Sequence, residues 1–147
     1  MFIRPAEQTD RESWVRMRDA LWPSAPGRHA GEIDRYFAGK LREPIEVLIA
    51  FDGQGNALGF VELSIRAYAE GCETDHVAFV EGWFVEQDAR GQGVGAALIS
   101  AAEVWARSQG CMELGSSAEV ENLSSAAAHL AVGFTETGVI RCFKKSL

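Results

Sequence analysis

Cysteine is scarce in this sequence, and basic side chains are outnumbered by acidic ones. The three cysteines, Cys72, Cys111 and Cys142, are widely spaced and form no Cys-x-x-Cys pair. We therefore expect neither a disulfide framework nor a zinc site, and no other metal. The 14 basic and 21 acidic residues give a formal net charge of −7. This charge disfavours nucleic acid as a partner and favours a cationic small molecule.

Long apolar runs are absent as well. No stretch reaches the roughly 20 apolar residues that a membrane-spanning helix needs. The first residues pass directly into a strand-like segment rather than a signal peptide. We therefore expect a cytoplasmic protein without a membrane partner. The 147 residues are 47% hydrophobic and contain no internal repeat, which indicates one globular domain over residues 1–147.

Strand-like and helix-like patterns follow one another along the chain. Thr9 and Glu12 have the spacing of a capping box at the start of a helix that ends before Pro23. Further helices are expected around residues 33–37 and over 93–109 and 124–132. Strands are expected over residues 2–4, 47–51, 57–66, 77–85, 111–114 and 139–143, with another short one near Phe134. This order indicates an α+β or mixed α/β fold.

A glycine-rich turn separates the most apolar strand, residues 77–85, from the clearest helix, residues 93–109. Glycines let the backbone approach a ligand closely, and free amides at the positive end of a helix favour a diphosphate. Arg90 would add charge or hold the loop. A Walker loop is excluded by the lack of Gly-Lys-Ser/Thr, and a dinucleotide fingerprint by the spacing of the glycines. The turn reads Arg90-Gly91-Gln92-Gly93-Val94-Gly95.

The spacing Arg-x-x-Gly-x-Gly after a strand resembles the signature of the GNAT superfamily of N-acetyltransferases. The resemblance covers nearly the whole chain. It implies a mixed, largely antiparallel sheet, splayed between its fourth and fifth strands, with helices on both faces. Members of this superfamily often form homodimers, so the resemblance leads us to expect a homodimer.

The resemblance also implies that acetyl-CoA is the cosubstrate. Its diphosphate would lie on the amides of residues 92–96, from Gln92 to Ala96. Its pantetheine arm would lie in the gap between the splayed strands, bonded by the backbone around Trp83 and Val85. Asn122 would also bond this arm. Asn122 is equally suited to be the N-cap of the helix that follows it.

Two residues are candidates for the proton transfers between an amine and a thioester. Glu81 is a carboxylate inside an otherwise apolar strand, and Gly82 beside it favours a bulge. Glu81 is the candidate base, with a salt-bridged or edge-exposed glutamate as the alternative. His129 occupies the position where many GNAT members carry a Tyr that is thought to protonate the CoA sulfur. The alternative for His129 is a packed helix histidine.

Several segments are similar to the aminoglycoside 6′-N-acetyltransferases, among them Leu21-Trp22-Pro23, Phe79-Val80-Glu81-Gly82 and Glu121-Asn122. The resemblance implies that Trp22, Tyr68 and Glu81 line the acceptor site. The subfamily carries carboxylates where this chain has Ser117 and Gly138, and polycationic sugars need such groups. Glu119, Glu121 and Glu136 are the candidates to replace them.

The favoured function is therefore acetyl transfer to the 6′-amine of an aminoglycoside by direct attack. A second hypothesis is acetylation of another small amine, a polyamine or a protein N-terminus. A third is a non-catalytic module that binds acyl-CoA. The glycine-rich turn alone does not separate the third hypothesis from the others, whereas Glu81 together with His129 favours catalysis.

Overall fold

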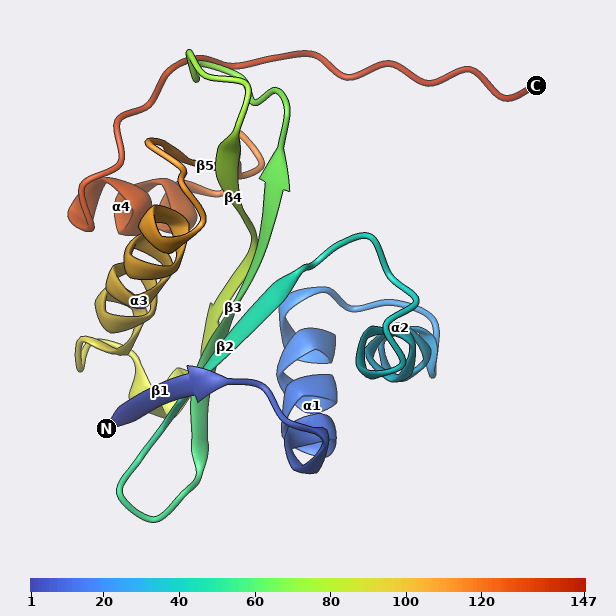
Figure 1. Ribbon diagram of the computed structural model, residues 1–147, viewed down its shortest axis with the longest axis vertical. Coiled ribbons are helices and arrows are strands. Elements are labelled where there is room, and N and C mark those ends of the chain that lie inside the picture. Colours follow the sequence, from blue (N-terminus) through green and yellow to red (C-terminus); the bar gives the residue numbers. More distant parts are fainter.

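A five-stranded sheet in the order β1-β2-β3-β4-β5 divides the molecule (Figure 1). The computed structural model describes all 147 residues. The first four strands pair antiparallel, and the last pairs parallel with β4. The sheet thus confirms the predicted mixed, largely antiparallel architecture. The strands are β1 (Phe2–Pro5), β2 (Glu46–Phe51), β3 (Ala57–Arg66), β4 (Val77–Val85) and β5 (Leu114–Ser116).

Helices cover both faces of this sheet (Figure 1). One face carries α1 (Arg11–Leu21) and α2 (Arg28–Phe37), and the other carries α3 (Val94–Ser108) and α4 (Leu123–Ala131). Two single 3-10 turns, Gln8–Asp10 and Gln87–Ala89, precede α1 and α3. None of these helices combines the length and the apolar character that crossing a membrane requires.

Two cores follow from the alternation of side chains along the strands. On the α1/α2 face, Trp14 and Met17 are fully buried together with Phe60 of β3. On the α3/α4 face, Val61 of β3 packs with Leu98 of α3. β4 contributes to both cores, which explains why nearly every one of its positions is apolar.

The start of α1 differs from the predicted capping box. The side chain of Asp10, not of Thr9, accepts a hydrogen bond from a backbone N–H, that of Glu7 at 2.8 Å. Asp10 is buried and is also bound by Arg4, at 2.7 and 3.0 Å. The prediction of a Thr9–Glu12 box was wrong because the ion pair from β1 places the box two residues earlier, on Glu7 and Asp10.

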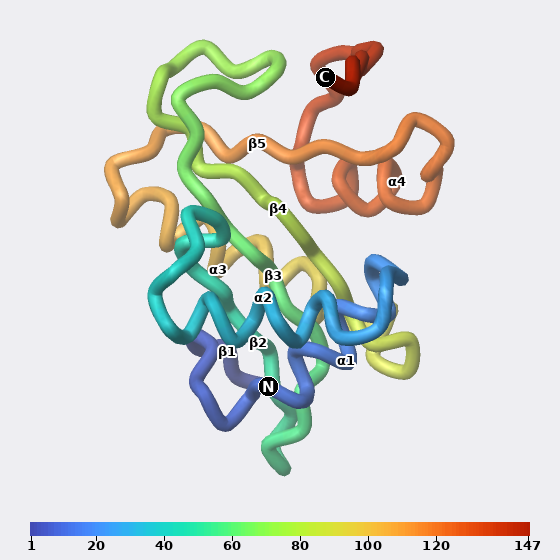
Figure 2. The backbone as a smooth tube through the Cα atoms, turned by 90° about the vertical axis from the view of Figure 1, so that its right-hand side faces the viewer, coloured from blue at the N-terminus to red at the C-terminus, as the bar shows by residue number.

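The fourth and fifth strands separate after a short contact. Their paired residues run from Ala78↔Leu114 to Val80↔Ser116, after which β5 ends and β4 continues to Val85. Figure 2 shows the two strands moving apart toward α4. On the β5 side, residues 81–85 of β4 therefore have no strand partner. This is the predicted splay.

The predicted strands at residues 139–143 and near Phe134 are absent. After Phe134, residues 135–147 form no helix or strand, donate and accept no backbone hydrogen bond, and are exposed throughout. Figure 1 shows this C-terminal arm, residues 135–147, leaving the body of the protein. The residues favour a strand, but a strand forms only against a neighbouring one. Within this chain the arm has no such neighbour.

Candidate active site

The glycine-rich turn forms the N-terminus of α3 and leaves its backbone amides free. Gly91 and Gly93 adopt left-handed backbone conformations, with φ of 76° and 84°, and Gly93 is the N-cap of the helix. No amide of residues 91–96 donates a backbone hydrogen bond; the first to do so is Ala97, to the carbonyl of Gly93 at 3.0 Å. These free donors stand at the positive end of a 15-residue helix, an arrangement suited to phosphate oxygens.

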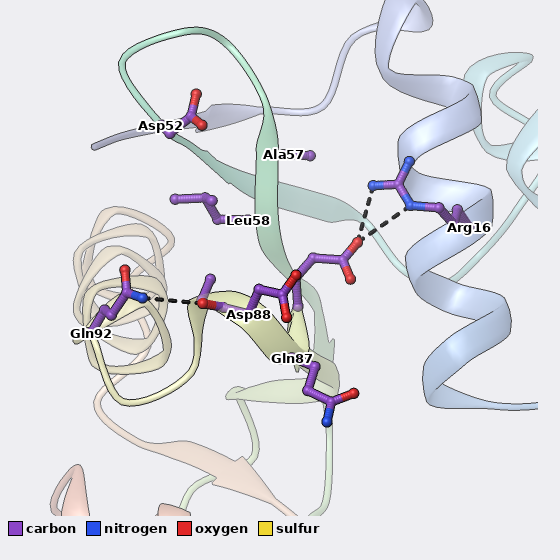
Figure 3. Close-up of a pocket in the computed structure, with 9 residues that line it drawn as sticks. Arg16, Asp52, Ala57, Leu58, Gln87, Asp88 and Gln92 are labelled. Atoms are coloured by element: carbon purple, nitrogen blue, oxygen red, sulfur yellow. Dashed lines mark hydrogen bonds and ion pairs between the residues drawn. The ribbon is translucent and has the colours of Figure 1, made fainter.

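The side chains of Arg90 and Gln92 hydrogen-bond to nearby backbone carbonyls and so stabilise the turn. Arg90 donates from Nε to the carbonyl of Val85 at 3.0 Å, so it holds the loop, one of its two predicted roles. Gln92 donates from Nε2 to the carbonyl of Asp88 at 3.1 Å, as the dashed line in Figure 3 shows. Both contacts keep these side chains on their own loop and leave the amides unobstructed.

A hollow beside this turn is a poor candidate for the diphosphate (Figure 3). Its charged side chains are mostly acidic, and its one arginine, Arg16, is paired with Glu86 at 3.0 Å. Such a lining repels phosphate. The hollow is lined by Arg16, Asp52, Ala57, Leu58, Glu86, Gln87, Asp88, Ala89 and Gln92.

Gly95 lets α3 lie close to β4. A Cβ at Gly95 would lie 3.2 Å from Cζ2 of Trp83 and 3.5 Å from Val85, so a larger residue would push the helix away. The indole Nε1 of Trp83 is buried and has no hydrogen-bond partner. An orphaned buried donor calls for a partner, and a ligand carbonyl in the gap beside β4 would supply one.

A β-bulge places Glu81 on the α1/α2 face. In the β3–β4 ladder Leu63 pairs with Val80 and Glu62 with Gly82, so Glu81 is the extra residue. Its carboxylate accepts from the Ser64 hydroxyl. Glu81 directly follows Val80, the last residue of β4 that pairs with β5, so its carboxylate is held at the point where the two strands part.

The carboxylate of Glu81 is also paired. Arg66 donates to it from Nε at 3.1 Å and from Nη2 at 2.8 Å, and the guanidinium stacks on Phe79 with 3.6 Å between Cζ and the ring centroid. The salt-bridged alternative of the sequence analysis therefore describes the geometry. A bidentate pair fixes the direction of a carboxylate, which suits a positioned base or a substrate anchor equally.

Trp22 lies directly against the bulge. A Cβ at Gly82 would stand 2.5 Å from Cη2 of Trp22, so the indole occupies the space that a side chain would take. The carbonyl of Trp22 is bound to Nε2 of His29 at 2.6 Å, which fixes the end of α1. Trp22 therefore lies against the residue that follows Glu81 in β4.

A buried charged group that was not predicted from the sequence lies beneath this surface. Glu62 is only 1% exposed, accepts from Nε1 of Trp14 at 2.9 Å, and lies 3.3 Å from Nε of Arg18. Arg18 in turn contacts Glu32 at 2.8 Å. Burial raises the pKa of Glu62, and the Arg18 charge and the Trp14 hydrogen bond oppose that rise. A carboxylate in an apolar strand, the feature that singled out Glu81, would have flagged it.

On the opposite face, His129 of α4 is bound to Ser116 at the end of β5. Its Nε2 lies 2.7 Å from Oγ of Ser116, and its Nδ1 lies 2.7 Å from the carbonyl oxygen of Ser125. The ring stands edge-on to Trp83, with 5.2 Å between centroids. Two predicted residues, Trp83 and His129, therefore meet at the gap. Ser116 has no signature in the sequence, because the fold alone brings it to His129.

The remaining predicted residues surround the site less closely. Asn122 is the N-cap of α4, since its side chain accepts from the N–H of Ser125 at 3.1 Å. Tyr68 is 68% exposed and donates to Glu70 at 3.2 Å on the loop after β3. Ser117 and Glu119 are exposed between β5 and α4, and Gly138 lies in the arm. No cluster of His, Cys, Asp and Glu is arranged to hold a metal.

Comparisons with known proteins give the class of the molecule. The acetyltransferase (GNAT) family matches residues 14–134. The chain therefore belongs to the GNAT family, which confirms the predicted class of enzyme, an N-acetyltransferase that uses acetyl-CoA.

Particular relatives are similar over almost their whole length. The chain is 52% identical to an aminoglycoside N(6′)-acetyltransferase type 1 of Klebsiella aerogenes, over 99% of this chain and 96% of the relative. The crystal structure of AAC(6′)-IG from Acinetobacter haemolyticus superposes with a TM-score of 0.91 at 34% identity, covering 100% and 99% of the two chains. AAC(6′)-Iy in complex with CoA-S-monomethyl-acetylneamine, a bisubstrate analogue, gives 0.88 at 35% identity, covering 99% and 98%.

Proposed function

We propose that this chain transfers the acetyl group of acetyl-CoA to the 6′-amine of an aminoglycoside. The observation that carries the proposal is the division of groups across the sheet. Glu81 and Trp22 lie on the α1/α2 face where β4 and β5 part, whereas the anion-binding turn and His129 belong to the α3/α4 face. An amine and a thioester could meet between them. The names of the relatives support the choice of aminoglycoside.

The α3/α4 face fits acetyl-CoA. The free amides from Gln92 to Ala96 would bind the diphosphate. The unpaired edge of β4 around Trp83 and Val85 would bond the pantetheine arm, and the orphaned indole N–H of Trp83 would donate to it. Asn122 uses its carbonyl oxygen as a cap, so its amide N–H groups stay free for the same arm.

The α1/α2 face fits a cationic acceptor. In the proposed reaction the amine attacks the thioester directly and Glu81 takes its proton. Trp22 would pack against the sugar ring next to that carboxylate. Tyr68, Ser117 and Glu119 would line the outer part of the site, and the acidic surface would draw the polycation in. His129 would be the source of the proton for the departing thiolate.

Acetylation of a smaller amine is the second candidate. It is favoured by Arg66, which already neutralises Glu81, and by Ser117 and Gly138, where the aminoglycoside subfamily carries carboxylates. With fewer free carboxylates, the site holds a second ammonium group less tightly. A substrate with only one amine has no second ammonium group, so the missing carboxylates do not weaken its binding.

Thiol release measured across a panel of amines tests the proposal. With a 6′-amino aminoglycoside, Glu81→Gln should lower kcat/KM by ~10²–10⁴-fold and leave acetyl-CoA affinity nearly unchanged. Glu103→Gln, which removes a half-buried carboxylate on α3, is the matched control. A loss confined to the amine KM would make Glu81 an anchor. Binding of acetyl-CoA without turnover of any amine would support the acyl-CoA-binding module instead.

We also propose that the chain works as a single acetyltransferase domain within a homodimer. The support is the C-terminal arm, whose Val139, Ile140 and Phe143 are 67%, 59% and 91% exposed. Holding an extended residue in place costs about 1–2 kcal/mol of conformational entropy. Within the chain the side chain of Thr137 lies against Gly71, but the apolar side chains beyond it are exposed and offset little of this cost. A second copy, with the same open edge on its β5, would supply the missing partner.

Light scattering on the full chain tests the homodimer. We expect a dimer that becomes a monomer when Ile140 and Phe143 are both replaced by Asp, while the same double change at exposed Met112 and Val104 has less effect. A wild-type monomer at micromolar concentration would refute it. The three free thiols, Cys72, Cys111 and Cys142, also fit our expectation of a reducing, cytoplasmic setting.

A further inference from the structure

Both ring nitrogens of His129 are already occupied. The carbonyl oxygen of Ser125 can only accept a hydrogen bond, so Nδ1, at 2.7 Å from it, carries a hydrogen. Nε2 lies 2.7 Å from Oγ of Ser116. When the ring is neutral, Nε2 accepts the Ser116 hydroxyl proton; when the ring is protonated, Nε2 donates to Ser116. In neither state does a ring nitrogen remain to meet a substrate.

The ring is also held on its other sides. Trp83 stands edge-on to it with an interplanar angle of 86°, and Phe134 packs against it at 5.1 Å between centroids. The turn of helix that carries Ser125 is capped by Asn122. A histidine fixed in this way keeps its contact with Ser116 rather than swinging toward the gap.

Ser116, in contrast, stands at the mouth of the gap. It pairs with Val80 in the last step of the parallel β4–β5 ladder, and both strands diverge beyond this pair. Paired residues of neighbouring strands share a face. Val80 packs in the α3/α4 core, so the Ser116 side chain lies on that face, while Glu81 lies on the other. The two candidate proton-transfer groups thus flank the same point from opposite sides.

We propose that Ser116 hands the proton to the departing CoA thiolate, with His129 as a positioning residue behind it. The inference rests on the proposed acetyl transfer. As the amine nitrogen bonds to the acetyl carbon, its proton passes to Glu81 and the carbon–sulfur bond breaks. The thiolate takes the hydroxyl proton of Ser116, and Ser116 takes the Nε2 proton of protonated His129. Exchange with water then returns a proton to His129 and removes one from Glu81.

Kinetics of two Ser116 variants test the relay. Ser116→Ala should lower kcat by about 10²-fold and leave the KM for acetyl-CoA nearly unchanged, since the hydroxyl acts only on the leaving group. Ser116→Thr keeps the hydroxyl and should stay within a few-fold of wild type. Ser100→Ala, the same chemical change at an exposed position of α3, is the control. Activity of Ser116→Ala within twofold of wild type would overturn the relay.

A double-mutant cycle separates the relay from direct action of His129. If His129 works through Ser116, then His129→Gln should cost little further in the Ser116→Ala background. Additive losses would mean that the two residues act separately, and the relay would be wrong. If the wild-type enzyme acetylates no amine, the proposed function fails and the relay fails with it.

Binding of products gives a readout that does not depend on turnover. By calorimetry, Ser116→Ala should weaken CoA about three- to tenfold, the worth of one hydrogen bond to sulfur, and leave desulfo-CoA unchanged. Equal effects on CoA and desulfo-CoA would show that Ser116 only shapes the pocket. Because this measurement needs no acceptor, it tests the contact even when the amine is in dispute.

Discussion

Replacing Gly82 by Ala should weaken the proposed acceptor site and spare the proposed acetyl-CoA site. The new Cβ would lie 2.5 Å from Cη2 and 3.1 Å from Cζ2 of Trp22. Ordinary carbon–carbon contacts are about 3.5–4.0 Å, so the indole must move by roughly 1 Å. The carbonyl of Trp22 is held by His29, which leaves rotation of the ring as the way out.

The size of the effect follows from this geometry. Overpacking of a closed core costs about 1–3 kcal/mol, and we expect the lower end because Trp22 is only half-buried. If the displaced indole loses about 1.4 kcal/mol of contact with the acceptor, the amine KM rises roughly tenfold. The amides that would bind the diphosphate lie at the start of α3, so acetyl-CoA affinity should stay within about twofold of wild type.

Thiol-release kinetics and calorimetry with CoA measure the two sides separately. Gly53→Ala is the matched control, because Gly53 has open space around it and no left-handed φ. An unchanged amine KM in a folded Gly82→Ala protein would refute the placement of the acceptor beside Trp22. An equal loss of CoA affinity would refute the division of the site across the sheet.

Three further changes probe the turn, the fold and the specificity. Gly93→Asp should weaken acetyl-CoA binding at least about tenfold in calorimetry, whereas Gly110→Asp, with a similar φ of 79° at the far end of α3, should not. Burial raises the pKa of Asp10, but the hydrogen bonds from Arg4 and from the Glu7 backbone together outweigh burial. The net effect is a pKa below the ordinary 3.8. Asp10→Asn should therefore lower the free energy of unfolding by about 2 kcal/mol at neutral pH, measured with denaturant. This difference from wild type should disappear as the pH falls below 3.8 through the folded-state pKa of Asp10. A difference that stays constant down to pH 2 would contradict the ion pair. Ser117→Asp should raise kcat/KM for an aminoglycoside about tenfold and barely change it for a monoamine, and no gain would count against the polycation.

Local patterns predicted the parts of the molecule that depend on local chemistry. The turn from Arg90 to Gly95 was visible because its glycines and its helix are neighbours in the chain. Glu81 stood out because a carboxylate is rare in a strand covered on both faces. The strand at residues 139–143 was wrong, because β propensity states a preference and not whether a partner is present. Ser116 could not be predicted, since its contact with His129 depends on where α4 docks.

The bulge in β4 makes Glu81, the proposed base, an extra residue that the core does not need. Val80 and Trp83 both face α3, and between them Glu81 and Gly82 share the other face. A strand shortened by one residue at this point would still alternate correctly, and each apolar side chain would keep its face. Different residues of β4 thus serve the packing of the core and the proposed reaction. Insertion or deletion of a single codon would add or remove this carboxylate while the apolar side chains of β4 keep their places in the two cores.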